Sequence, residues 1–339
     1  MPWKSANANI AQRLLEGAFM PPIFIVLSLF LFIGLSGIAY AAEIAVLNSA
    51  GLPYYEQAII GFKAEIPAAT SVREYNLNGQ LAEGRQIAKS LRASPPDLIF
   101  AVGLKAAIAA KLEIFDTPVV FCMVLNPEAH GLPAPNMTGI GVRPSAETQL
   151  TALRSVVPNR NRVGVLYDEE QSGDFIRQAH RAAKQQGLEL FAVAVRRQEE
   201  IPNAVRALLP KIDALWLIQD QTVISESAIP FFLESTLDAK MPLFTFSLSL
   251  VQQGALGALV LDPWTVGQQA AHIALARLSG QHASNGSLQT PMHLQLALNL
   301  NSAEHLDLVL PPELIRMAGH LFGGPGALAQ QPGDSNVIP

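Results

Sequence analysis

Two stretches of the sequence place hydroxyl, amide and aromatic side chains directly after an apolar run and before a helical pattern. They are IAVLNSAGLPYYEQAIIGF at 44–62 and VGVLYDEEQSGDFIRQAHRAAKQQG at 163–187. The residues of interest are Asn48, Ser49 and Tyr54 in the first stretch, and Tyr167, Ser172 and Gly173 in the second. Backbone N–H groups at the start of a helix can bind a carboxylate, and aromatic rings supply apolar contact. We therefore predict that the two stretches form matching walls of one cleft for a small organic ligand.

Other predicted strands end in residues of the same kind. In open parallel sheets, ligands bind beyond the carboxyl ends of the strands, so the residues that follow strands are the candidates for a site. Outside the two stretches, these candidates are Gly103, Met123, Asn126, Asp220, Phe246, Ser247 and Asp262.

Several candidates also have a purely structural interpretation. Ser172 is either the N-cap of a helix predicted from Asp174 or a ligand contact. Asp220 ends the apolar run ALWLIQ, so its carboxylate either caps a turn or pairs with a cation. Tyr54 and Tyr55 are helical neighbours that point ~100° apart, which makes it difficult for both to face inward. The residue types alone leave these interpretations open.

Signatures of enzymes and metal sites are missing from the sequence. It has no G-x-x-x-x-G-K-[ST] phosphate loop, no G-x-G-x-x-G, no G-x-S-x-G and no H-E-x-x-H. The seven histidines lack ligand spacing, and the single cysteine, Cys122, lies in the apolar run VVFCMV, where a buried thiol is expected. We predict a protein that is not an enzyme and that uses no metal or cofactor.

Short apolar runs alternate with amphipathic segments from Glu43 onward. The predicted strands are 44–47, 72–75, 98–102, 119–121, 163–167, 189–193, 214–218, 243–246 and 258–261. The predicted helices are 55–65, 81–92, 105–112, 146–156, 174–186, 201–208, 225–240 and 265–279. Alternation of this kind predicts parallel sheets with helices on both faces. The fold class is therefore α/β, with two doubly wound parallel-sheet lobes.

The composition is that of a globular protein with large cores. Of the 339 residues, 50% are apolar and 15% are charged, and this length allows two domains. A net charge of −5 and the absence of a Lys/Arg-rich run argue against nucleic acid as a partner.

The N-terminal segment has the pattern of an export signal. Lys4 and Arg13 precede the apolar run 23–40, and an A-x-A pattern ends at Ala41. We predict a signal peptide over 1–41, cleaved after Ala41, and hence a periplasmic or secreted protein. The run is close to the ~18 apolar residues that a membrane span needs, so an uncleaved anchor is the alternative.

Extended stretches are predicted to cross between the lobes at 136–147, 262–264 and 292–298. The N-terminal lobe then comprises 43–140 and about 263–291, and the C-terminal lobe comprises 141–262 and about 292–320. Residues 321–339 are rich in Gly, Pro and Gln, and we predict a disordered tail there.

A set of stretches occurs in one order from residue 43 to about 320: IAVLNSAGLPYYEQAIIGF, DLIFAVGLKA, TPVVFCMVLNPEAHGL, NMTGIGV, RVGVLYDEEQSGDF, IDALWLIQDQTVIS, MPLFTFSLSLVQQGAL and LDPWTVGQQAA. Together they resemble the substrate-binding proteins of ABC transporters with a type I periplasmic-binding-protein fold. Within that family, the sequence is most similar to the branch that includes tryptophan- and phenylalanine-binding members. The resemblance implies two α/β lobes joined by three crossovers, a Venus-flytrap arrangement that traps a small molecule.

The resemblance also implies a function and a site. The function is to bind a small organic molecule, an amino acid among the candidates, and pass it to an ABC permease in the inner membrane. The first wall would be Asn48, Ser49, Tyr54, Gly103 and 123–126, and the second Tyr167, Ser172, Gly173, Asp220 and 246–247, with Asp262 near the hinge. In relatives that bind amino acids an acidic residue takes the amine, and Asp220 is the candidate here.

Departures from the family pattern at Leu104, Asn126 and Trp264 leave the identity of the ligand open. The same fold also serves as the ligand-binding input of sensor or receptor systems, and an exported enzyme is a further alternative. We expect the protein to act as a monomer.

Overall fold

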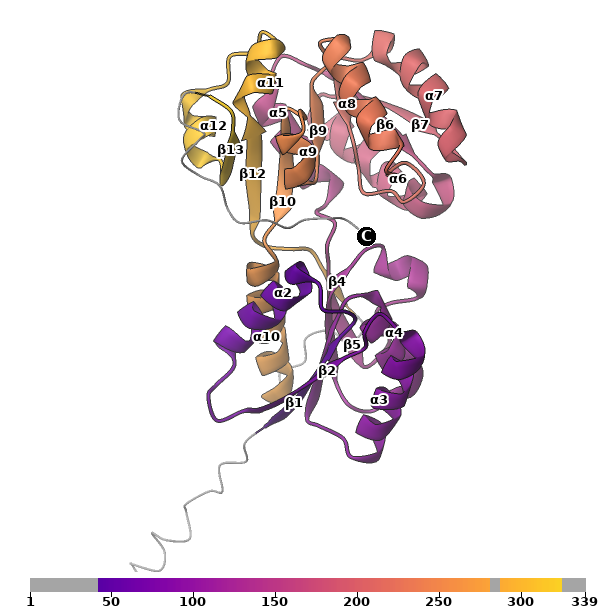
Figure 1. The fold of residues 1–339 in the computed structure, drawn as a ribbon, viewed down its shortest axis with the longest axis vertical. Coiled ribbons are helices and arrows are strands. Elements are labelled where there is room, and N and C mark those ends of the chain that lie inside the picture. The colour runs from indigo at the N-terminus through magenta and orange to yellow at the C-terminus, as the bar shows by residue number, and fades with distance from the viewer. Residues whose placement is uncertain (1–41, 281–286, 325–339) are drawn as a thin grey trace, which may run out of the picture. The chain divides into compact units, whose positions relative to one another are not determined.

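The computed structural model of the protein describes residues 42–280 and 287–324 (Figure 1). The predicted leader, 1–41, and the part of the predicted tail at 325–339 lie outside the described residues. In the described part, the chain forms a six-stranded sheet and a seven-stranded sheet, mostly parallel and flanked by helices. The predicted α/β class with two doubly wound lobes is confirmed.

The first sheet has the strand order β11-β5-β4-β3-β1-β2, and its paired strands are parallel. Its strands are β1 Glu43–Asn48, β2 Ser71–Asn76, β3 Leu98–Val102, β4 Val119–Val124, β5 Met137–Gly141 and β11 Leu288–Gln289. Its helices are α2 Pro53–Glu65, α3 Leu81–Ala93, α4 Leu104–Glu113 and α10 Pro263–Leu278. Parallel order brings the carboxyl ends of β1, β3 and β4 to one edge, side by side.

The second sheet has the order β13-β12-β10-β9-β8-β6-β7, in which β12 runs antiparallel to β10. Its strands are β6 Arg162–Tyr167, β7 Glu189–Ala194, β8 Ala214–Trp216, β9 Leu243–Thr245, β10 Gly257–Leu261, β12 Leu294–Asn299 and β13 His320–Phe322. Its α-helices are α5 Ala146–Val156, α6 Glu169–Gln185, α7 Ile201–Leu208, α8 Ala228–Asp238, α9 Leu248–Gln252, α11 Leu300–His305 and α12 Pro312–Met317. The ends of β6, β8, β9 and β10 therefore share one edge.

The chain passes between the sheets after β5, after β10 and after β11. The first passage leads from Gly141 to α5, the second turns at Asp262, and the third runs from Gln289 to Leu294. Because these passages lie far apart in sequence, the two lobes are each built from separate segments of the chain.

Apolar side chains cover both faces of each sheet. In the first sheet, Phe100 packs with α2 and α10 on one face, whereas Ile99 packs with α3 and α4 on the other. In the second, Trp216 belongs to the core under α5 and α6, and Leu215 to the core under α7 and α8. Burial on both faces explains why the central strands read as continuous apolar runs.

Helix α10 enters the first lobe after the Asp262 passage and lies against α2 (Figure 1). Two glycines allow this close approach. A Cβ atom on Gly61 would lie 2.1 Å from the Trp264 carbonyl oxygen, and one on Gly267 would lie 2.0 Å from the Ala58 carbonyl oxygen. The α2–α10 contact therefore depends on the absence of side chains at these positions.

The structure differs from the sequence-based prediction in several elements. The stretch predicted as the first crossing contains strand β5 of the first sheet, and the short helices α9, α11 and α12 were not predicted. Helix α6 begins at Glu169 and not at Asp174. The stretch predicted as a third crossing contains strand β12, which completes the second sheet at Leu294–Asn299. Strand β13 includes Leu321, the first residue of the predicted tail.

Candidate functional site

Asn48 and Ser49, at the end of β1, are buried and hydrogen bonded within the first lobe. Asn48 Nδ2 donates to Glu56 Oε1 at 2.8 Å, and the Ala50 N–H donates to Asn48 Oδ1 at 3.3 Å. Ser49 Oγ accepts from the Ala106 N–H at 2.9 Å, so it caps the start of α4 from a neighbouring strand. Both predicted residues thus hold the loop that forms the edge of the sheet.

Tyr54, Tyr55 and Gly103 gather at the same edge. The two tyrosine rings meet edge to face with their centroids 4.4 Å apart, and burial raises the pKa of both phenols. Gly103 has φ 85°, and a Cβ atom there would lie 2.6 Å from Tyr55 Oη and 2.7 Å from Ser49 Oγ. Tyr55, which was not among the predicted site residues, therefore lies against two that were.

Met123, near the end of β4, and Asn126, two residues after that strand ends, adopt left-handed backbone conformations with φ of 59° and 46°. The pairing of β4 with β5 shifts register between Phe121 and Val124, which accommodates the first of them. Left-handed conformations of residues other than glycine cost about 1–3 kcal/mol each, and they cluster at functional sites. The end of β4 is thus the strained part of the first edge.

A hydrogen bond connects this strained segment to the second lobe. Asn126 Nδ2 donates to the Gln171 carbonyl oxygen of α6 at 3.3 Å. The two predicted walls therefore contact each other through Asn126.

Helix α6 begins with Asp168 as its N-cap, because Asp168 Oδ1 accepts from the Glu170 N–H at 2.9 Å. Ser172 lies within the helix, so its interpretation as an N-cap is wrong. Its side chain is 1% exposed, and its hydroxyl has no hydrogen-bond partner among the described residues. A buried hydroxyl without a partner needs an explanation, and a ligand group is one.

Tyr167 is the last residue of β6, and Gly173 lies in α6. Both are close to Glu169, the first residue of α6. Burial raises the pKa of the Tyr167 phenol, which also hydrogen bonds to Glu169. A Cβ atom on Gly173 would lie 2.5 Å from Glu169 Oε1. The Glu169 carboxylate therefore contacts both predicted residues.

Asp220 is 1% exposed, and its carboxylate accepts from three backbone N–H groups. Oδ2 accepts from Asp168 at 2.9 Å, while Oδ1 accepts from Thr222 at 3.0 Å and Val223 at 3.3 Å. Of the two interpretations left open by the sequence, turn capping is the one these contacts support. A contact between Asp220 and the amine of a ligand remains a prediction.

Arg143, in the passage from β5 to α5, was not predicted and lies at the centre of the second edge. Its guanidinium donates to the Gln219 carbonyl oxygen, and its Cζ atom lies 4.8 Å from the Phe175 ring centroid. Burial lowers its pKa to about 10, and the charges of Asp220 and Glu128 act in the opposite direction. Arg143 therefore stays a cation at neutral pH. In the sequence, the signal for Arg143 was a single charged residue in a predicted crossing segment, and it did not follow a predicted strand.

The last three predicted residues follow β9 and β10. Phe246 is partly buried, and Ser247, 9% exposed, precedes α9 without a side-chain cap hydrogen bond. Asp262 caps α10 by accepting from the Trp264 N–H at 3.1 Å. Burial lowers the pKa of His320, and the negative charge of Asp262 acts in the opposite direction. Asp262 thus occupies one of the passages between the sheets.

Comparison with known proteins places this geometry in a family. A family model described as "ABC transporter substrate binding protein" matches residues 64–321. The chain belongs to the family of ABC transporter substrate-binding proteins. This confirms the resemblance read from the sequence and the prediction that the protein is not an enzyme.

Individual relatives of this substrate-binding protein are distant in sequence. A "Tyrosine-binding protein" of Clostridioides difficile is 23% identical over 241 residues, which is 69% of each chain. A ligand-free, open structure of a substrate-binding protein with adhesive properties from Clostridium difficile has a TM-score of 0.70 at 21% identity, covering 84% of this chain and 100% of that one. An ABC domain from Streptococcus pneumonia in complex with L-Trp has a TM-score of 0.59 at 22% identity, covering 83% and 99%. These structures show the fold.

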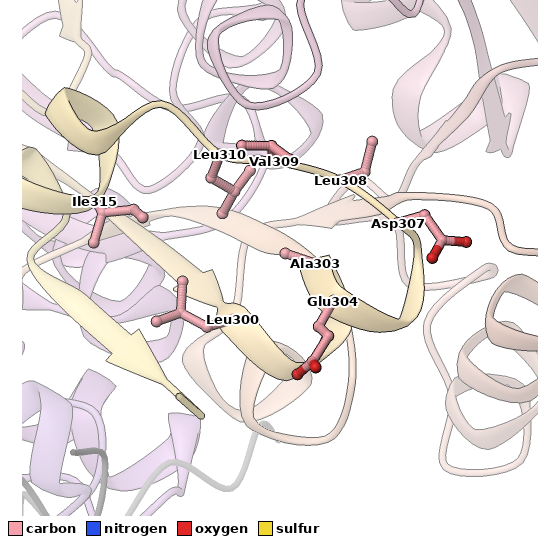
Figure 2. Close-up of a pocket in the computed structure, with 8 residues that line it drawn as sticks. All are labelled: Leu300, Ala303, Glu304, Asp307, Leu308, Val309, Leu310 and Ile315. Carbon is pink, nitrogen blue, oxygen red and sulfur yellow. The ribbon is translucent and has the colours of Figure 1, made fainter. Parts of the chain in front are cut away.

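Other features of the substrate-binding protein lie away from the strand ends. Figure 2 shows a pocket of about 550 Å³ on α11, α12 and the loop between them, lined by Leu300, Ala303, Glu304, Asp307, Leu308, Val309, Leu310 and Ile315. None of these is a predicted site residue. Across residues 42–280 and 287–324, there is no group of three or more metal-ligating side chains. In the same ranges, no helix is both long and apolar enough to cross a membrane.

Proposed function

We propose that this protein is the extracytoplasmic binding component of an ABC importer. In this proposal, it binds an amino acid between the carboxyl edges of its two sheets and delivers it to a permease in the inner membrane. Family membership supports the transport role. The relatives described as tyrosine-binding and as a complex with L-Trp support an amino acid as the solute.

One observation carries the proposal for the site. The residues that follow β4 in the first sheet reach α6 of the second through the hydrogen bond from Asn126 to Gln171. Asn126 of the first wall therefore contacts the residue that precedes Ser172 of the second, near the edges where ligands bind in open parallel sheets. Hinge motion at the three passages would open and close such a site.

The test is a thermal unfolding screen of the full-length chain against the twenty L-amino acids, followed by calorimetry of the hits. A ligand at 100 times its Kd stabilises the folded state by about 2.7 kcal/mol, which corresponds to a rise in Tm of about 4–5 °C for a chain of this length. Lack of a shift with every amino acid would refute an amino acid as the solute.

Matched aromatic substitutions localise the binding. Tyr54→Ala should weaken binding of the hit, because Tyr54 lies at the first edge and its ring is half buried against Tyr55. Phe115→Ala is the control, because Phe115 is 60% exposed and is not a site candidate. Equal affinity of both variants would place the solute elsewhere. For the predicted leader, mass spectrometry of the exported protein should find Ala42 as the first residue.

A further inference from the structure

Three buried polar atoms without hydrogen-bond partners lie on neighbouring residues at the second edge. In the described part of the chain, Arg143 Nε, Ser172 Oγ and Gln219 Oε1 are closed to water and make no hydrogen bond. Buried polar atoms of this kind are rare in native proteins, since each loses its hydration without compensation.

Printed contacts bring these residues together around the guanidinium of Arg143. Arg143 donates to the backbone carbonyl of Gln219, and the Phe175 ring lies against one face of its guanidinium. Ser172 precedes Phe175 by three residues on α6, and residues with that spacing are neighbours on the same helix face. Gln219 therefore contacts Arg143 directly, and Ser172 lies one turn before the Phe175 ring that contacts it.

Arg143 is also a cation whose side chain is partly buried. None of the ion pairs between described residues includes it. Asp220 acts on Arg143 through its charge, and its oxygens accept from backbone N–H groups. Asp168 is likewise engaged, by the Thr222 hydroxyl at 2.6 Å, and Glu128 is exposed. Asp220 and Glu128 act on the guanidinium through their charge, whereas Arg143 Nε makes no hydrogen bond among the described residues and is available to an anion from outside the chain.

We propose that Arg143 is the specificity-determining residue of the site and binds the carboxylate of an α-amino acid. The inference rests on the proposed function and deepens it. Arg143 Nε and the Ser172 hydroxyl donate to the carboxylate, and Gln219 Oε1 accepts from the α-ammonium group. The three atoms are closed to water in this conformation, so the solute reaches them when the lobes move about the passages.

The experiment compares amino acids with their carboxamides, which retain the ammonium group and the side chain but lack the negative charge. The probes are L-tyrosine, L-tryptophan and L-phenylalanine with tyrosinamide, tryptophanamide and phenylalaninamide, measured by calorimetry on the full-length chain. The wild type should prefer the acid at least about 10-fold, the range for a charge-assisted hydrogen bond. Arg143→Gln should bind acid and amide within about 3-fold of each other.

Arg177→Gln is the matched control. Arg177 lies on the same helix, is exposed, and forms ion pairs only with Glu169 and Asp174 among the described residues. This variant should keep the preference for the acid. Ser172→Ala should lose about 3- to 10-fold in affinity for the acid and little for the amide, and it provides a second test should Arg143→Gln fail to fold.

The outcomes separate this inference from the proposed function. Binding of acid and amide with equal affinity by the wild type, or an unchanged preference in both Arg143→Gln and Ser172→Ala, would overturn the role of Arg143 while the amino-acid function stands. A wild type that binds none of the twenty amino acids would overturn both.

Discussion

Replacing Gly103 by alanine tests how tightly the first edge is built. Gly103 has φ 85° and ψ 168°, a backbone conformation that is nearly restricted to glycine. The added Cβ would also lie 2.6 Å from Tyr55 Cζ and Oη and 2.7 Å from Ser49 Oγ. The substitution therefore meets two separate obstacles, one in the backbone and one in packing.

The expected loss is the sum of these two contributions. The backbone conformation costs about 1–3 kcal/mol for a residue with a side chain. Forcing a methyl group against Tyr55 and Ser49 costs about 1–3 kcal/mol more, because the Ser49 hydroxyl is fixed by its bond to Ala106. We expect Gly103→Ala to lower the free energy of unfolding by about 2–6 kcal/mol.

Gly187→Ala separates the two contributions. Gly187 also has a positive φ, 70°, but a Cβ atom there would meet nothing within 4 Å. This control should lose only about 1–2 kcal/mol in equilibrium urea denaturation. If Gly103→Ala loses no more than Gly187→Ala, then the contact of Gly103 with Tyr55 and Ser49 does not constrain the edge, and the description of the first wall is wrong.

Three further substitutions test other contacts by urea denaturation. Gly267→Ala should lower the free energy of unfolding by about 2–4 kcal/mol, because its Cβ would lie 2.0 Å from the Ala58 carbonyl oxygen. A loss smaller than that of Gly187→Ala would contradict the α2–α10 contact. Glu113→Ala should lower the free energy of unfolding by about 1–3 kcal/mol, because Glu113 is 4% exposed and pairs with Arg85 at 2.7 Å. Unchanged stability would show that this ion pair contributes nothing. Asp220→Asn should lower the free energy of unfolding by about 1–3 kcal/mol, because the new amide nitrogen would face a backbone N–H. An unchanged free energy of unfolding would argue against turn capping by Asp220.

The pattern of strands and helices was predictable because burial dictates it. Strand β3 is buried at every residue and has the predicted bounds, and α5 begins directly after Ser145, whose hydroxyl caps it. Strand β12 was missed because its N-terminal half is only partly buried and it alternates polar and apolar residues, LQLALN. The start of α6 was misplaced because Gly173 was read as part of the loop, whereas Asp168 provides the cap.

The site was predictable only where a strand end marked it. Ser49 and Ser172, whose ligand contacts remain a prediction, were chosen as candidates because ligands bind beyond the carboxyl ends of parallel strands. Arg143 was not, because it lies in a passage between the sheets and gains its surroundings from Phe175 and Gln219, which are distant in the chain. Tyr55 was missed because the angle between helical neighbours suggested that only one of the two rings faces the site, while the structure pairs them edge to face.

The role of Asp220 shows why a charge at a strand end does not by itself identify a ligand contact. A carboxylate in that position binds an amine if its oxygens are unoccupied, and shapes a turn if backbone N–H groups reach them first. Here the Asp168 N–H, which belongs to a residue 52 positions earlier in the chain, donates to Asp220 Oδ2, and no local sequence pattern predicts that contact. Asp220 also acts on Arg143 through its charge, which helps to keep the guanidinium protonated. Arg143 Nε makes no hydrogen bond among the described residues, so this cation has unused capacity to bind a solute.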